Sequence, residues 1–292
     1  CGAEHEKALA IAREIGDAEL EARALGGLGD AAYASGRMRS AIDHFQRCSD
    51  LCRARGFGRI DVSVRFMIGH CLRYQNQIEV ALEEHVRGAQ ASIEVGNRLS
   101  EMTSYESSGI LLTELGRYGE AVPMLEKALA LSRQLGTRRY DAPILSHLGV
   151  SLCECGRLQE GRAAIDEGLN VSRETGIGFT GPLALGCKAL YAESADEAKA
   201  ALAEAESILA RGCIGHNYFW FYRDAIEYSL RRERWDEALR YAQALDDYTA
   251  PEPLPWSDLV IARARALAAF GRGDRSPSLE AELKRVHRGA AS

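Results

Sequence analysis

The side chains best suited to chemistry in this sequence are its histidines, and one of them has a basic neighbour at helical spacing. His70 and Arg73 are three residues apart, so a helix would place them on one face between Phe66 and Tyr74. Such a pair can line the polar part of a groove, or it can belong to a catalytic or ligand-binding site. The other histidines are scattered, at positions 5, 44, 85, 147, 216 and 287.

No motif for catalysis, metal binding or phosphate binding accompanies these histidines. The sequence has no G-x-x-x-x-G-K-S/T loop and no H-E-x-x-H, and its glycines punctuate helices instead of clustering as in a dinucleotide-binding loop. Glu83, Glu84 and His85 have the pattern of an ordinary solvated helix surface. We therefore expect no enzyme activity, no metal and no cofactor.

Eight cysteines are spread too thinly for a disulfide scaffold. None forms a C-x-x-C pair, which a structural zinc site would need. Free cysteine is usually a small buried apolar residue, so we expect core positions and a cytoplasmic location. The cysteines are at positions 1, 48, 52, 71, 153, 155, 187 and 213.

Composition then limits the classes of protein and partner. The chain has 292 residues, of which 46% are hydrophobic and 27% charged, so it is globular and not disordered. With 42 acidic against 36 basic residues it lacks the positive surplus that non-specific nucleic-acid binding requires. No apolar run approaches the roughly 20 residues of a membrane span. Only 7 prolines, among many Ala, Leu, Glu and Arg residues, favour helix.

A repeat of forty residues organises most of the chain. Four independent tracks share this step, which chance does not explain. They are Gly16, Gly56, Gly96, Gly136 and Gly176; Gly29, Gly69, Gly109 and Gly149; Ala41, Ala81, Ala121 and Gly161; and Gly36, Asn76, Gly116 and Gly156.

Each track has a structural explanation. Gly16 and its equivalents follow helical stretches, where a glycine in the left-handed region ends a helix without a Cβ clash. Gly36 and its equivalents are residue types that tolerate the same region, so they close a first helix before a second begins. Glycine in mid-helix costs about 1 kcal/mol, so the track of Gly29 indicates that two antiparallel helices approach closely.

The helix–turn–helix unit resembles the tetratricopeptide repeat. Leu28-Gly29, Ile68-Gly69, Ser108-Gly109 and Leu148-Gly149 match its first helix, and Ala41 with Phe45 and Cys48, or Ala121 with Leu125 and Ala128, match its second. The period of forty exceeds the usual thirty-four, and the closing proline is missing. Longer helices account for both departures, as in the long repeats of large bacterial regulators. The resemblance implies an all-α, right-handed α-solenoid of about seven antiparallel helix pairs.

The repeats are regular over residues 1–176 and less regular over 177–292, which we expect to complete a single solenoid with C-terminal capping helices at 256–270 and 277–287. Pro251, Pro253 and Pro255 predict an extended linker before them. A lone second helix at 4–15 lacks its partner, so we expect a fragment of a longer protein.

A wider resemblance rests on two runs. Gly212-Cys-Ile-Gly-His-Asn-Tyr-Phe-Trp-Phe-Tyr-Arg-Asp224 with Pro253-Leu-Pro-Trp256, and Phe66-Met-Ile-Gly-His-Cys-Leu-Arg73, are similar to the C-terminal repeat regions of bacterial class III adenylate/guanylate cyclases that carry an ATPase module. ATPase transcription factors of the maltose-regulator type are a neighbouring resemblance. Both imply a repeat region attached to a signalling domain.

Five consecutive aromatic residues stand out in a chain with 7% aromatic residues. A helix cannot bury all of them on one side, because successive residues turn by about 100°. They form either an enlarged core layer or a docking surface for a partner or domain. The five are Tyr218, Phe219, Trp220, Phe221 and Tyr222.

We therefore predict a non-catalytic interaction and regulatory module that binds a protein, a peptide or upstream domains of its own chain, with no nucleic acid or membrane as partner. The alternative is a ligand or peptide sensor that gates an attached cyclase, ATPase or transcription-factor domain. A ligand-sized pocket near His70–Tyr74 would favour the sensor, and an open groove would favour the interaction module. In solenoids of this kind first helices line the concave face, which implies a groove of Asp30, Tyr33, Phe66, His70, Arg73, Tyr74, Glu106, Ser107, His147, Tyr191, Trp220, Arg223 and Glu227.

Overall fold

Fifteen α-helices and one short 3-10 helix make up the chain in a computed structural model that describes residues 2–291. No strand occurs within that range. The helices are α1 (Gly2–Ile15), α2 (Ala18–Ala34), α3 (Met38–Arg55), α4 (Gly58–Tyr74), α5 (Ile78–Glu94), α6 (Arg98–Glu114), α7 (Tyr118–Leu135), η1 (Arg138–Tyr140), α8 (Asp141–Glu154), α9 (Leu158–Thr175), α10 (Gly181–Tyr191), α11 (Ala195–Ala210), α12 (His216–Arg231), α13 (Trp235–Thr249), α14 (Pro255–Gly271) and α15 (Pro277–Ala291).

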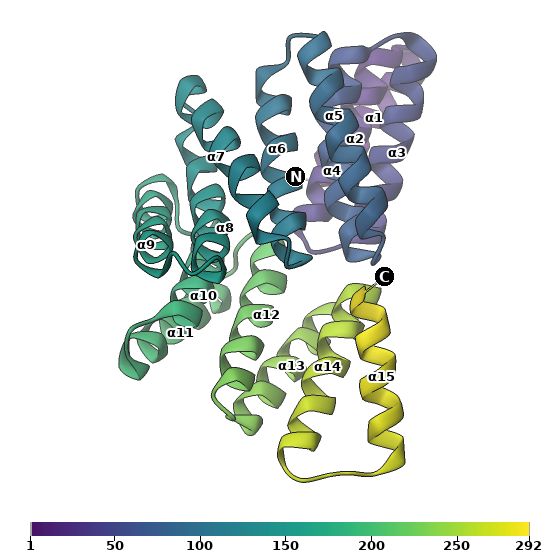
Figure 1. Ribbon diagram of the computed structural model, residues 1–292. Coiled ribbons are helices and arrows are strands. Elements are labelled where there is room, and N and C mark those ends of the chain that lie inside the picture. Colours follow the sequence, from purple (N-terminus) through teal and green to yellow (C-terminus); the bar gives the residue numbers. More distant parts are fainter. Residues whose placement is uncertain (1, 292) are drawn as a thin grey trace.

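The helices form the predicted right-handed solenoid (Figure 1). After α1, they follow one another as seven antiparallel pairs, from α2 and α3 to α14 and α15. Each helix packs mainly on its neighbours in sequence, as in other repeat arrays. Among residues 2–291 no helix combines the length and the apolar character that a membrane span requires.

Residues in the left-handed region end the helices where the repeat predicts them. Gly16, Gly56, Gly96 and Gly136 have φ between 67° and 75°, and Asn76 adopts 57° at the turn inside its pair. Each leaves the helix without the steric cost that most side chains would meet there. The forty-residue step is therefore a spacing of helix ends.

The glycines in mid-helix lie where a second helix crosses. A Cβ on Gly109 would stand 2.5 Å from Cγ of Leu125 on the partner helix α7. Gly29 faces Phe45 and Gly69 faces His85 in the same way, with still less room. His85 is therefore fully buried, and its expected place on a solvated surface is wrong. The side chain of the second helix fills the space that glycine leaves open.

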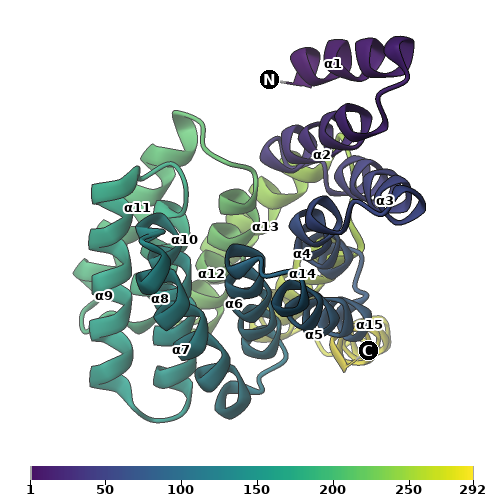
Figure 2. The same cartoon turned by 90° about the horizontal axis from the view of Figure 1, so that it is seen from above.

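The last repeats return to the first ones, so the superhelix closes on itself (Figure 2). The amide of Gly215, just before α12, donates to the carbonyl of Ala34 at the end of α2 over 2.8 Å. Glu252 accepts from the amide of Arg39 at 2.6 Å and from the hydroxyl of Ser40 at 2.7 Å, at the start of α3. Helix α14 also contacts α4. The concave side is consequently narrowed between α2, α4, α6 and α12.

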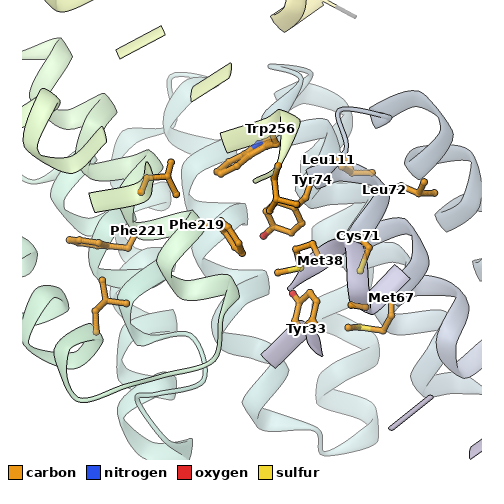
Figure 3. Packing of buried hydrophobic residues seen from close by; sticks show 14 of the residues in the cluster. Tyr33, Met38, Met67, Cys71, Leu72, Tyr74, Leu111, Phe219, Phe221 and Trp256 are labelled. Carbon is orange, nitrogen blue, oxygen red and sulfur yellow. The ribbon is translucent and has the colours of Figure 1, made fainter. Parts of the chain in front are cut away.

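The aromatic run of α12 supplies much of this closure (Figure 3). Phe219 is buried against Tyr74 of α4, with ring centroids 4.7 Å apart, and against Trp256 of α14 at 6.0 Å. Phe221 is buried against Tyr241 of α13 at 5.8 Å. A partner cannot reach Phe219 or Phe221, so the expected docking surface is wrong for these residues. The helix uses them to hold its own repeats together.

The two tyrosines of the run are half-buried and also make contacts within the chain. Tyr218 stacks on Tyr248, with centroids 4.2 Å apart, and donates to the carbonyl of Leu209 over 2.9 Å. Tyr222 packs beside Tyr241 at 6.5 Å. Of the five, Trp220 is the one that lines the concave side.

Candidate functional site

A pocket of about 950 Å³ occupies the concave side of the solenoid. Its wall repeats with the period of the sequence, because equivalent positions of successive first helices face the same way. The lining residues Arg23, Ser63, Thr103 and Pro143 are forty apart, as are Ile60, Ser100, Tyr140 and Thr180. Within α4 the lining residues Ile60, Ser63, Phe66, Met67 and His70 follow one helical face. The repeat therefore builds the pocket.

Six of the predicted groove residues line this pocket. Tyr33 comes from α2, Phe66 and His70 from α4, Glu106 from α6 and Trp220 from α12. Asp30 also lines it, from an exposed position on α2. These residues lie far apart in sequence, and the closure of the superhelix brings the last of them to the others.

Aromatic rings form a continuous wall along the pocket. Phe66 and His70 have centroids 6.1 Å apart, His70 and Tyr33 6.3 Å, and Tyr33 and His216 5.7 Å. Trp220 stacks on His216 at 4.5 Å, with 28° between the planes. Such rings offer large apolar faces at little cost in conformational entropy.

The wall continues through residues that the sequence analysis did not identify. Phe179 lies 5.7 Å from His216 and 6.0 Å from Tyr140. A signal for Tyr140 was present, because it stands eighty residues after Ile60 on the same track. Phe179 precedes α10 in an irregular segment, and periodicity alone could not assign it to the wall.

Hydrogen bonds fix the orientation of His70 and His216 on the pocket wall. Nε2 of His216 donates to the carbonyl of Phe179 over 2.6 Å, so its Nδ1 accepts from the Tyr33 hydroxyl at 3.2 Å. The Ser107 hydroxyl donates to the Thr103 carbonyl at 2.7 Å, and Nε2 of His70 can donate to Ser107 at 3.0 Å. Ser107 is thus behind His70 and not on the pocket wall.

Burial keeps these histidines uncharged. It lowers the pKa of His216 to about 4 and that of His70 well below its ordinary value of 6.5. Two further histidines in the interior, His85 and His147, have pKa values lowered by the same cause. At neutral pH His70 and His216 supply hydrogen bonds and ring faces but no positive charge.

Glu106 is the carboxylate in the depth of the pocket. The residue is 6% exposed and lines the cavity. Burial raises its pKa to about 8, and no counter-ion opposes that effect. Tyr33 and Tyr140 line the cavity with it. Among the described residues it has no hydrogen-bond or ion-pair partner.

Arg73 does not face the pocket, and its predicted role in the groove is wrong. The residue is 1% exposed, and its Nε lies 2.9 Å from a carboxylate oxygen of Glu114 on α6. Nη1 of Arg223 on α12 contacts the other oxygen at 2.5 Å, and Nη2 of Arg223 lies 2.8 Å from Asp224. We call Arg73, Glu114, Arg223 and Asp224 the ionic cluster. It joins α4, α6 and α12.

The remaining predicted groove residues also lie outside the pocket. Tyr74 is fully buried beside Arg73, and His147 is buried against Trp220 with centroids 5.6 Å apart. The Tyr191 hydroxyl donates to Glu154 at 2.5 Å, and Glu227 pairs with Arg263 at 2.8 Å. All four lie on first helices, but the closure of the superhelix buries Tyr74 and His147, and the half-buried Tyr191 and Glu227 pair with other side chains.

The described residues contain no group of three His, Cys, Asp or Glu side chains that could hold a metal ion. Of the cysteines within this range, five are buried, Cys155 is exposed and Cys213 is half-buried. Cys1 lies outside the described residues.

Two segments of the chain match models of the tetratricopeptide repeat, at residues 1–54 and 102–135. These two segments are therefore similar to tetratricopeptide repeats. Proteins of this repeat type are typically non-catalytic. A search of curated protein sequences finds no significant match to it.

Solved structures share the fold at low sequence identity. A Rap protein in complex with competence and sporulation factor has a TM-score of 0.68 at 13% identity, over 92% of this chain and 77% of that one. The Rap conjugation gene regulator of plasmid pLS20, in complex with the Phr* peptide, has a TM-score of 0.63 at 16% identity. The match covers 94% of this chain and 74% of that one. A signal transduction ATPase with numerous domains and a tetratricopeptide repeat sensor, from Pyrococcus horikoshii, has a TM-score of 0.53 at 14% identity. The match covers 94% of this chain and 42% of that one.

Proposed function

We propose that this chain is a peptide-binding regulatory module whose ligand occupies the concave pocket. The observation that carries the proposal is the pocket near His70, with about 950 Å³ and a wall of aromatic rings. Its volume is at the upper end for small-molecule sites and suits a short peptide. Tetratricopeptide repeats and the peptide complexes of the two Rap proteins support the same class of ligand.

Regulation would follow from the way the superhelix closes. The pocket wall combines α2 and α4 with α12, so a ligand that contacts both sides favours one relative position of the first and last repeats. A domain attached to this chain would receive that change. The fold shared with a repeat sensor of a signalling ATPase supports such a domain as the receiver.

A selection from random heptapeptides displayed on phage, with the immobilised chain as target, tests the proposal. Phe66→Ala removes a half-buried ring of the pocket wall and should weaken the selected peptides by about 2 kcal/mol, or roughly thirtyfold. Glu126→Ala, at an exposed position of α7, is the matched control and should bind like wild type. A selection without binders, or binders that tolerate Phe66→Ala, would contradict the proposal.

A further inference from the structure

Glu106 is a buried carboxyl without a partner, and it faces a cavity. Its residue is 94% buried, yet it lines the pocket, and no described residue donates a hydrogen bond to it or pairs with it. Burying a carboxyl in this way costs free energy that folding alone does not recover. An unpaired polar group of this kind calls for an explanation, and a ligand that supplies the missing partner is one.

Among residues 2–291 no cation pairs with Glu106. Arg73 is committed to Glu114, and Arg23 pairs with Glu19 at 2.7 Å on the rim. Arg59 also lines the pocket, but its side chain is exposed. His70 and His216 are uncharged at neutral pH, because burial lowers their pKa values.

The rings around Glu106 suit a positive charge as well. Tyr33 and Tyr140 line the same cavity as Glu106. Phe66 and Trp220 line the same cavity. The faces of aromatic rings attract ammonium and guanidinium groups, and the attraction grows when water is excluded. A carboxylate with aromatic walls is therefore a site for an organic cation.

We propose that the pocket selects a cationic group of its peptide ligand, an ammonium or a guanidinium, which pairs with Glu106 between the aromatic rings. This inference rests on the proposed function, since it concerns the ligand of the same pocket. The charge can come from a lysine or arginine side chain or from a free amino terminus.

Pairing with a cation would also change the protonation of Glu106. Burial raises its pKa to about 8, so the carboxyl is mostly protonated at pH 7. A bound cation favours the carboxylate, and the proton leaves to solvent. Binding should thus release up to about one proton and strengthen as the pH rises from 6 to 8. The other titratable or charged groups of the pocket wall are His5, Asp30, Tyr33, Arg59, His70, Tyr140 and His216, with Arg23 in its pair.

Five pools of labelled hexapeptides distinguish the possibilities, each with random Gly, Ala, Ser, Leu and Phe around one fixed residue. Four pools are capped at both ends and carry arginine, lysine, norleucine or glutamate. The fifth carries norleucine and a free amino terminus. Fluorescence anisotropy measures their affinity for wild type, for Glu106→Gln and for Glu126→Gln. The first variant keeps the shape of the side chain but cannot ionise, and the second makes the same change on the exposed surface of α7.

We expect a basic pool or the free-terminus pool to bind wild type at least about tenfold more tightly than capped norleucine, as charge-assisted hydrogen bonds allow. Glu106→Gln should reduce this preference to less than about twofold and abolish proton release, measured by calorimetry in two buffers of different ionisation enthalpy. Glu126→Gln should match wild type. Which pool binds best identifies the source of the charge.

The failures are distinguishable. If capped norleucine binds as tightly as the cationic pools, the pocket binds peptides without selecting charge, and only the inference is wrong. If the glutamate pool binds best, the exposed Arg59 determines selection, and the inference is again wrong. If no pool binds wild type, the proposed function fails together with it.

Discussion

Glu106 and Glu114 of α6 both have largely buried side chains, but their surroundings are opposite. Glu114, at the end of the helix, lies between Arg73 and Arg223, at 2.9 and 2.5 Å. Glu106, two turns earlier, faces the pocket without a counter-ion. The same side chain thus has two uses in one helix. With its partners inside the protein it holds distant repeats together, and without them it is available to a ligand.

The largest expected effect is the loss of the paired glutamate. Glu114→Ala leaves Arg73 buried without an opposite charge and should reduce the free energy of unfolding by about 3–5 kcal/mol. Urea denaturation followed by circular dichroism measures it. The surface change Glu126→Ala should stay within about 0.5 kcal/mol. A loss below about 1 kcal/mol for Glu114→Ala would mean that the ionic cluster does not hold the repeats together.

The unpaired Glu106 should make the stability of the protein depend on pH. Its pKa is raised from an ordinary value of 4.5 to about 8, so the folded protein keeps a proton that the unfolded chain releases in this range. The contribution of Glu106 to stability is therefore complete below about pH 4.5 and is lost as the pH rises to about 8. Glu106→Gln cannot ionise and does not lose this contribution. From pH 5 to pH 7 its free energy of unfolding should therefore rise by up to about 2–3 kcal/mol relative to that of wild type.

Urea denaturation of both proteins across this pH range tests the prediction. The buried histidines titrate alike in the two proteins, so they cancel in the difference. A difference in stability that does not change with pH would show that Glu106 is ionised in the folded protein, and the contrast with Glu114 would lose its basis.

The sequence was sufficient for the fold because helix ends and close helix crossings leave a periodic record. Gly56 and Gly69 each belong to a track with a local steric cause, so counting forty residues places every helix of the regular region. The same register selected Phe66, His70 and Glu106, which line one pocket.

The sequence was insufficient for the rest of the site because closure is a long-range property. Nothing near Arg73 indicates that Glu114, 41 residues later, and Arg223, 150 residues later, approach it. The aromatic run was likewise undecided between core and surface, since its partners Tyr74 and Trp256 lie on distant helices. Register gives the face of a helix, but it does not give what another part of the chain places on that face.

A third prediction tests the helix that carries both glutamates. Gly109 lies between them, and a Cβ there would stand 2.5 Å from Leu125. Gly109→Leu should overpack α6 against α7 and cost about 1–3 kcal/mol. The matched surface change Glu94→Ala should stay within about 0.5 kcal/mol. Thermal denaturation measures both variants. Equal melting temperatures would show that α6 and α7 pack less closely at Gly109 than the structure indicates.

The smallest expected effect tests whether burial or short distance makes the ion pair between Arg73 and Glu114 strong. Arg133 of α7 and Glu167 of α9 are 2.8 Å apart, as close as Arg73 and Glu114, but both side chains are about half exposed. Water screens exposed charges, and holding two long side chains together costs entropy. A double-mutant cycle with Arg133→Ala and Glu167→Ala should therefore give a coupling of about 0.2–1 kcal/mol. At about 1 M salt, where charges are screened within roughly 3 Å, the coupling should nearly vanish. If this coupling were as large as the loss of stability in Glu114→Ala, the short distance between the charges would be sufficient for a strong ion pair. Burial would then not explain the strength of the pair between Arg73 and Glu114.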